Sequence, residues 1–257
     1  MPPASLLQPR IATRSYESVR WRLPGGAGTT LHLGWFERAS VQVRVARIGE
    51  PATLMTWCRA QGVGDAVVGG FFVRPHGRPL GELRVDGRPQ SAVAFDYPWS
   101  ALRSCVHVSG RNLRLAPRHE IEPEPAGDLL QAGPLMVRGG ISAIREGHDP
   151  EGFSAGADQF DSDITDGRYP RAAVALCGPR LLALVCDGRS NGESGMTLGE
   201  LADTLVELGA ETAINLDGGG SASLVYGGRL RNRPHEEHGI EILGGRPIAT
   251  ALVFQAR

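Results

Sequence analysis

The chain has 257 residues, of which 41% are hydrophobic and 21% charged. This balance supplies enough apolar side chains for a packed core and excludes a chain that is disordered throughout. Glycine, with 35 residues, occurs at roughly twice its usual frequency and points to many tight turns and short strands. The net charge of -1 excludes the strongly basic character of a general nucleic-acid-binding protein. All 27 basic residues are arginine, so Schiff-base and P-loop lysine chemistry are excluded as well.

The apolar segments and the cysteine spacing bear on where the protein is located and on its redox chemistry. No run of 18 apolar residues is present, so we expect no membrane span. Residues 1–22 lack the apolar stretch of a signal peptide, and we therefore expect a cytoplasmic location. The cysteines form no C-x-x-C pair, which favours buried free thiols over a zinc or redox site; they are Cys58, Cys105, Cys177 and Cys186.

The first half of the chain is dominated by short strands. Alternating apolar and polar residues predict strands over 30–36 and 41–48, and Pro51 precedes a predicted helix over 52–60. A strand over 66–68, several strands within 80–115 and a strand over 135–137 follow. The segment 118–128, rich in proline and acidic residues, is typical of a surface connection, and the polar segment 145–170 predicts a long loop.

The C-terminal third carries clearer signals. Continuous apolar runs over 172–177 and 181–186, joined by Gly178-Pro179, predict a buried hairpin. Thr197 and Glu200 form the pattern of a capping box for a helix that runs to Leu208, with Gly209 at its C-terminal end. Further strands are predicted over 213–216, 224–226, 229–231 and 248–254. We therefore predict a single sheet-rich α+β domain with mixed or antiparallel sheets and a few short helices, in which a strand-rich region 1–59 packs on the domain formed by 60–257.

The strongest chemical signal is Asn215-Leu216-Asp217-Gly218-Gly219-Gly220-Ser221. Three consecutive glycines lose much chain entropy on folding, and they allow backbone N–H groups to approach an anion closely. Asn215 and Asp217 alternate with apolar residues, so both side chains are expected on one face of a buried strand. We predict an anion-binding bend beside an acidic side chain. The alternative is a flexible hairpin loop with Asp217 as a turn residue.

A second group of polar residues flanks the predicted hairpin 172–186. Arg171 precedes its first strand, and Asp187 and Arg189 follow its second. If the two strands are antiparallel neighbours, Arg171 and Asp187 lie at the same end. The pair is then either an ion pair that fixes the hairpin or a phosphate clamp beside an acid or nucleophile.

Two acidic or histidine-rich segments are weaker candidates for metal binding. His235-Glu236-Glu237-His238 lacks the H-E-x-x-H spacing. The aspartates of the long loop do not fit the EF-hand spacing and favour a solvated acidic loop; they are Asp158, Asp161, Asp163 and Asp166. We expect no metal and no cofactor.

Several motifs together resemble the phosphodiester glycosidase domain, a family with bacterial members, and the resemblance extends over about residues 60–256. The motifs that carry it are Gly69-Gly70-Phe71-Phe72, Gly133-Pro134-Leu135, Pro170-Arg171, Val185-Cys186-Asp187-Gly188-Arg189, Gly195-Met196-Thr197-Leu198, Asn215-Leu216-Asp217-Gly218-Gly219-Gly220-Ser221, Asn232-Arg233-Pro234 and Arg246-Pro247.

This resemblance implies a hydrolase that cleaves the bond between a sugar's anomeric carbon and phosphate in a sugar-1-phosphodiester, either a small molecule or a glycan. It implies catalytic roles for Asp217, Asp187 and Arg171, without deciding which carboxylate is nucleophile, base or orienting group. The remaining residues are expected to bind substrate; they are Gly69, Gly70, Phe71, Arg189, Asn215, Gly218, Gly219, Gly220 and Ser221.

Two alternatives remain open. Val68, Ala172 and Ala222 are apolar where family members commonly carry polar residues. If these positions line the cleft, sugar specificity and activity differ from those of the family, and the replacements favour a sugar-phosphate-binding module that has lost catalysis. A metal-dependent phosphodiesterase that uses the aspartate-rich loop is the weaker alternative.

Overall fold

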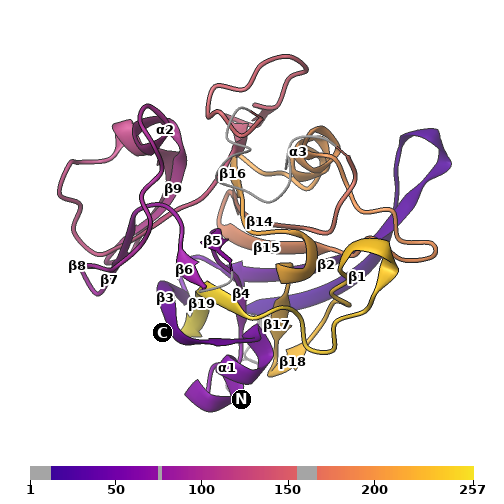
Figure 1. Ribbon diagram of the computed structural model, residues 1–257, viewed down its shortest axis with the longest axis horizontal. Coiled ribbons are helices and arrows are strands. Elements are labelled where there is room, and N and C mark those ends of the chain that lie inside the picture. The colour runs from indigo at the N-terminus through magenta and orange to yellow at the C-terminus, as the bar shows by residue number, and fades with distance from the viewer. Residues whose placement is uncertain (1–12, 75–76, 155–166) are drawn as a thin grey trace, which may run out of the picture.

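The computed structural model describes residues 13–74, 77–154 and 167–257 (Figure 1). These ranges contain three α-helices, which are α1 (Leu54–Gln61), α2 (Trp99–Leu102) and α3 (Leu198–Glu207). The strands are β1 (Arg14–Arg22), β2 (Gly28–Glu37), β3 (Val41–Ala52), β4 (Ala66–Val68), β5 (Phe72–Val73), β6 (Arg78–Pro79), β7 (Leu83–Val85), β8 (Arg88–Pro89), β9 (Ser104–Ser109), β10 (Asn112–Pro117), β11 (Asp128–Gln131), β12 (Leu135–Arg138), β13 (Ile141–Ser142), β14 (Arg171–Cys177), β15 (Arg180–Cys186), β16 (Thr212–Asn215), β17 (Leu224–Tyr226), β18 (Arg229–Leu230) and β19 (Ile248–Ala256).

Three larger sheets and a two-stranded sheet, β5-β6, organise these strands. The largest has seven strands in the order β1-β2-β15-β14-β16-β12-β13, and two five-stranded sheets have the orders β18-β17-β4-β19-β3 and β10-β9-β11-β7-β8. The ladders that join the named strands within each sheet are antiparallel. The predicted sheet-rich α+β fold with antiparallel sheets and few helices is therefore confirmed.

The predicted hairpin 172–186 forms the centre of the large sheet as β14 and β15. Its register pairs Arg171 with Cys186 and Cys177 with Arg180. Alternate residues face two different cores, because Val174 and Val185 belong to one apolar cluster while Ala173 and Leu184 belong to the other. A strand covered on both faces reads as a continuous apolar run, which explains the pattern in the sequence.

Helix α3 covers one face of the large sheet, on the side shown uppermost in Figure 1. Thr197 Oγ1 accepts a hydrogen bond from the backbone N–H of Glu200, and the Glu200 carboxylate accepts one from Thr197 N–H, so the predicted capping box is present. Gly209, with a φ of 84°, follows the last turn as predicted. Leu201 and Leu205 of α3 pack into the cluster that lines this face.

The N-terminal part differs from the prediction in detail. The helix predicted from residue 52 begins at Leu54, because β3 continues to Ala52 and the Thr53 side chain caps the helix. Strand β1 and helix α2 were not predicted as separate elements. Strands β1 and β2 join the large sheet beside β15, and β3 pairs with β19. All four cysteines are buried and unpaired, as expected.

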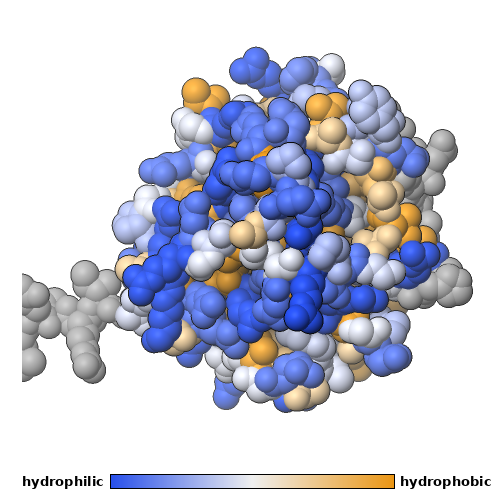
Figure 2. Space-filling model, turned by 90° about the vertical axis from the view of Figure 1, so that its left-hand side faces the viewer, coloured by the Kyte–Doolittle hydropathy of each residue, from blue (hydrophilic) through white to orange (hydrophobic). Residues whose placement is uncertain are grey.

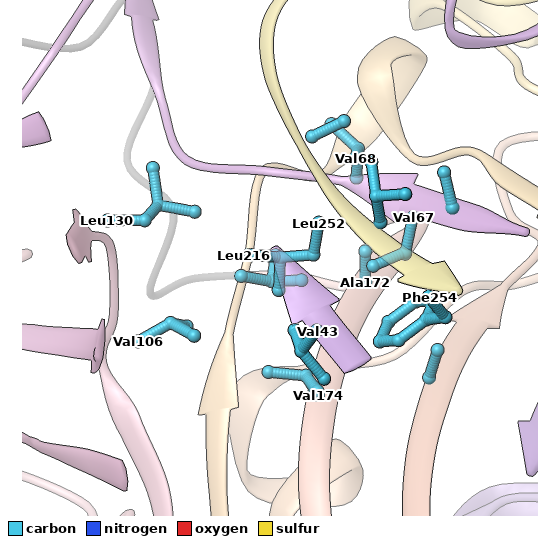
Figure 3. Packing of buried hydrophobic residues seen from close by; sticks show 14 of the residues in the cluster. Val43, Val67, Val68, Val106, Leu130, Ala172, Val174, Leu216, Leu252 and Phe254 are labelled. Carbon is cyan, nitrogen blue, oxygen red and sulfur yellow. The ribbon is translucent and has the colours of Figure 1, made fainter. Parts of the chain in front are cut away.

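The main core lies between the large sheet and the β18-β17-β4-β19-β3 sheet, where Val43, Val67, Leu216, Leu252 and Phe254 pack together (Figure 3). The face on the left of Figure 1 is mainly hydrophilic, with scattered apolar residues (Figure 2). No helix of the described residues is long and apolar enough to cross a membrane.

Candidate active site

The candidate site forms where β16 ends. Two residues past this strand, the backbone N–H of Asp217 donates to the carbonyl of Gly69 at 2.9 Å. Gly69 in turn lies against Thr250 of β19, since a Cβ on this glycine would be 2.4 Å from Thr250 Oγ1. The Gly69-Gly70 pair is thus glycine because two strands and the Asp217 backbone meet there.

Three backbone N–H groups of the glycine bend are already engaged. Gly218 N–H donates to Asp217 Oδ1 at 2.9 Å. Gly219 N–H donates to the Pro170 carbonyl at 2.8 Å, and Ser221 N–H donates to the Gly218 carbonyl at 3.1 Å. The geometry therefore assigns these three donors to the protein's own oxygen atoms.

Each glycine of the bend leaves room for a different neighbour. A Cβ on Gly218 would lie 2.8 Å from the Pro170 carbonyl oxygen, and one on Gly219 would lie 3.3 Å from Arg189 Nη1. A Cβ on Gly220 would lie 2.8 Å from Glu236 Oε1. An arginine and a carboxylate of the chain itself are thus packed against the bend.

Two arginines and two glutamates form a charged cluster over this bend. Arg246 donates through Nε to Glu236 Oε1 at 2.7 Å. Arg189 is held more loosely, with Nη1 3.9 Å from Glu236 and Nη2 3.9 Å from Glu237. Its guanidinium carbon lies 5.0 Å from the centre of the Tyr169 ring. Arg189 thus has ion-pair partners at a distance too long for direct hydrogen bonds.

The backbone of Arg189 is also unusual. Its φ of 59° lies in the left-handed region, which costs a non-glycine residue about 1–2 kcal/mol. Strained conformations of this kind concentrate at functional sites.

Asp217 has an altered acidity. Burial raises the pKa of Asp217 to about 6, while the Ser221 hydroxyl and the positive charges of Arg246 and Arg74 act in the opposite direction. A carboxyl group with a pKa near the working pH is suited to proton transfer, and above pH 6 it is mainly ionised.

Arg171 and Asp187 lie at the same end of the β14–β15 hairpin, as the register requires. Strand alternation turns the two side chains to opposite faces of the sheet. Arg171 is buried and donates through Nε to the Met196 carbonyl at 2.9 Å and through Nη2 to the Gly167 carbonyl at 3.2 Å. Both predicted readings of the pair assumed that the two side chains face each other, which this arrangement does not give them.

Asp187 is buried and both of its carboxylate oxygens accept hydrogen bonds. Oδ1 accepts from the backbone N–H of Arg233 at 2.9 Å, and Oδ2 lies 3.0 Å from His32 Nε2. His32 was not predicted as a site residue. Its only sequence signal is a polar residue in the alternating strand 30–36, which does not reveal its partner.

Two other predicted binding residues, Asn215 and Phe71, lie in a polar and an apolar environment respectively. Asn215 is buried and donates through Nδ2 to the Gly133 carbonyl at 2.9 Å. Phe71 packs in a small apolar cluster with Phe153, at 5.8 Å between ring centres.

The three apolar replacements belong to the core. Val68, Ala172 and Ala222 are fully buried and are part of the main apolar cluster; Figure 3 shows Val68 and Ala172 among its residues. They therefore do not line an open cleft.

Two residues of the candidate metal-binding segment 235–238 already have partners within the protein. His235 Nδ1 lies 2.8 Å from the Arg233 carbonyl, and Glu236 pairs with Arg246. In the part of the chain that the structure describes, no three histidine, cysteine or acidic side chains gather as a metal-binding set. The four aspartates of the predicted acidic loop lie outside the described residues.

A separate cavity of about 1120 Å³ lies between β12, β13 and the start of α3. Its lining includes Arg138, His148 and Thr197 but not Asp217. The charged cluster and this cavity are thus different features of the surface.

Comparison with known proteins places the chain in a family. The family model described as phosphodiester glycosidase matches residues 62–255, and the chain belongs to this family. The matched segment contains Asp187, Arg189, Asp217, Glu236 and Arg246.

Curated relatives carry a more specific name. The chain is 29% identical over 217 residues to mouse N-acetylglucosamine-1-phosphodiester alpha-N-acetylglucosaminidase, covering 83% of this chain and 38% of that protein. It is also 29% identical over 189 residues to the human protein of the same name, covering 72% of this chain and 36% of the human one. The chain thus spans little more than a third of the length of these relatives.

Solved structures confirm the fold. The zebrafish N-acetylglucosamine-1-phosphodiester alpha-N-acetylglucosaminidase catalytic domain, described as auto-inhibited by its pro-peptide, superposes with a TM-score of 0.71 at 21% identity, over 95% of this chain and 83% of that one. A hypothetical protein from Synechocystis gives a TM-score of 0.65 at 16% identity, over 95% of this chain and 62% of that one.

Proposed function

We propose that this protein hydrolyses sugar-1-phosphodiesters at the bond between the anomeric carbon and the phosphate oxygen. The observation that carries the proposal is the side chain of Asp217, with its raised pKa, beside a bend packed against Arg189 and close to the charge of Arg246. Family membership supports the reaction class, and the names of the curated relatives support N-acetylglucosamine as the sugar.

Hydrolysis of a sugar-1-phosphodiester suits a site without a strong general acid. Water adds its oxygen to the anomeric carbon, the bond from that carbon to the phosphate oxygen breaks, and a phosphate monoester leaves with the bonding electrons. The second pKa of such a monoester is about 6, so it leaves as an anion without needing a strong general acid. Asp217 then serves as the nucleophile or as the base that takes the water proton.

Arg189 and Arg246 are the groups that would bind the phosphate. Arg189 and Arg246 bring two fork-shaped cations to the same side of the glycine bend as Glu236. Such cations stabilise the charge that develops on the departing phosphate. Since the N–H donors of Gly218, Gly219 and Ser221 are engaged internally, the arginine side chains are the main anion-binding groups in this proposal.

The test uses N-acetylglucosamine-1-phosphate esterified to p-nitrophenol, in water enriched in ¹⁸O. The proposal expects free N-acetylglucosamine that carries the label, with p-nitrophenyl phosphate unlabelled. Label in the phosphate would instead show attack at phosphorus and support a phosphodiesterase. The variant Asp217→Asn should lower kcat by about 10²–10⁴-fold, and turnover of the wild type should rise with pH through about 6. Normal turnover by a folded Asp217→Asn variant would remove Asp217 from the mechanism.

A further inference from the structure

A hydrogen-bond network of three side chains links the N-terminal hairpin to the candidate site. The Tyr16 hydroxyl lies 2.8 Å from His32 Nδ1, and His32 Nε2 lies 3.0 Å from Asp187 Oδ2. Tyr16 is on β1 and His32 on β2, both outside the segment 62–255 that the family model matches. The register places His32 opposite Val185, two residues before Asp187 and therefore on the same face of the sheet.

The direction of these hydrogen bonds follows from the Asp187 end. An ionised carboxylate only accepts, so His32 must donate through Nε2–H. In the neutral imidazole Nδ1 then accepts, and the Tyr16 hydroxyl donates to it. Burial raises the pKa of Tyr16, so its hydroxyl keeps the proton that this arrangement needs. A hydrogen bond at one ring nitrogen thereby fixes which tautomer the other nitrogen presents.

The same hydrogen-bond network supports the segment that leads to Glu236. The guanidinium carbon of Arg231 lies 4.4 Å from the centre of the Tyr16 ring, and the backbone N–H of Arg233 donates to Asp187 Oδ1 at 2.9 Å. The 231–233 segment thus contacts this hydrogen-bond network at both of its ends, at Tyr16 and at Asp187. Asp187 is also held by its backbone, because its N–H donates to the Thr30 carbonyl of β2 at 3.0 Å.

What this network fixes is the turn that leads to Arg189. Only Gly188 separates Asp187 from Arg189, whose left-handed φ has to be maintained by its surroundings. Gly188 has no space for a side chain, since a Cβ there would lie 2.8 Å from Pro170 N. An anchored Asp187 therefore helps to fix the backbone from which the Arg189 side chain extends.

We infer that Tyr16 and His32 are positioning residues of the proposed site, which orient Asp187 and through it hold Arg189 in place for the substrate phosphate. The inference rests on the proposed function, and it assigns the β1–β2 hairpin a part in the reaction.

The kinetic test compares buried histidines in two sheets. His32→Leu should raise KM for the p-nitrophenyl substrate by about tenfold, the lower end of the effect of removing a supporting hydrogen bond. His32→Gln, whose amide can donate in place of Nε2–H, should recover most of this loss, and Tyr16→Phe should give a smaller loss. The matched control is His107→Leu, because His107 is equally buried and has one hydrogen bond, to the Ala126 carbonyl, in a different sheet. Tyr226→Phe is the control for Tyr16→Phe. A folded His32→Leu variant with the KM of the wild type, or the same change in both histidine variants, would overturn the inference.

A second measurement does not need turnover. Nitrogen-15 NMR should show His32 in the Nε2–H tautomer in the wild type and a mixture of tautomers in Tyr16→Phe. An Nδ1–H tautomer in the wild type would contradict the hydrogen-bond chain. If the wild type releases no sugar, the proposed function fails, whereas the NMR result still decides whether the chain from Tyr16 to Asp187 exists.

Discussion

Glu236 lies in the space that Gly220 leaves open, with its Oε1 atom 2.8 Å from the place of a Cβ on that glycine. The sequence predicted that a bound anion would lie on this bend, and the structure finds a carboxylate of the chain itself there. The same carboxylate neutralises Arg246 and, more weakly, Arg189. Since a substrate phosphate needs those cations, Glu236 and the phosphate would compete for them.

The first prediction tests this competition with Glu236→Gln. Removing the negative charge should lower KM for the sugar phosphodiester by up to about fivefold, because a partly exposed ion pair is worth up to about 1 kcal/mol. The measurement is steady-state kinetics at low ionic strength. Glu82→Gln is the matched control, because Glu82 pairs with Arg118 away from the site and its side chain is 34% exposed, against 30% for Glu236. A raised KM for Glu236→Gln would instead show that the carboxylate is needed to hold Arg246 in place.

The second prediction concerns two glycines of the same bend, Gly218 and Gly220. Gly220→Ala meets the flexible end of the Glu236 side chain, so it should be tolerated and should lower KM as Glu236→Gln does. Gly218→Ala meets the fixed carbonyl of Pro170 at 2.8 Å and should lower the free energy of unfolding by about 1–3 kcal/mol. Denaturant unfolding and kinetics of both variants check this. Full additivity of Gly220→Ala and Glu236→Gln would argue against a shared cause.

The third prediction is the pH dependence of stability that Asp217 produces. Its pKa in the folded protein, about 6, is above the ordinary aspartate value of 3.8, so folding favours the protonated carboxyl group. The stability from this group is complete below about pH 4 and is lost as the pH rises through 6. Asp217→Asn, which stays neutral, should therefore gain on the order of 2 kcal/mol relative to the wild type between pH 4 and pH 7.5.

The measurement is denaturant unfolding of both proteins at the two pH values. Asp203→Asn, which changes an exposed carboxylate on α3, serves as the control for the loss of one negative charge. A difference between wild type and Asp217→Asn that does not change with pH would mean that Asp217 has an ordinary pKa.

Sequence patterns predicted the features that depend on neighbouring residues. The hairpin 172–186, the capping box of Thr197 and Glu200, and the strand before Asp217 all follow from local periodicity or capping chemistry. The contact of Gly69-Gly70 with Asp217 and Thr250 joins segments more than 140 residues apart, and only the resemblance to a family pointed to it.

The missed features depend on long-range pairing. His32 meets Asp187 only because β2 lies beside β15, a pairing that spans about 150 residues and leaves no local pattern. The sequence predicted an anion-binding bend, but the use of its N–H groups depends on Pro170 and on side chains from other segments. Glycine content shows that something approaches the backbone closely and does not show what it is.

The last prediction separates two arginines that the sequence suggested as phosphate ligands. Arg171 is buried and uses its fork on two backbone carbonyls. Lysine cannot reproduce two fixed donors, so Arg171→Lys should lower the free energy of unfolding by about 2 kcal/mol. Arg189 has two long ion-pair contacts and a ring contact with Tyr169 at 5.0 Å, so Arg189→Lys should leave stability within about 0.5 kcal/mol. It should raise KM about tenfold, because the phosphate loses a fork-shaped partner. Denaturant unfolding and kinetics on the p-nitrophenyl substrate measure the two effects. Since each variant makes the same chemical change, the reverse pattern would assign the phosphate to Arg171 and make Arg189 the structural residue.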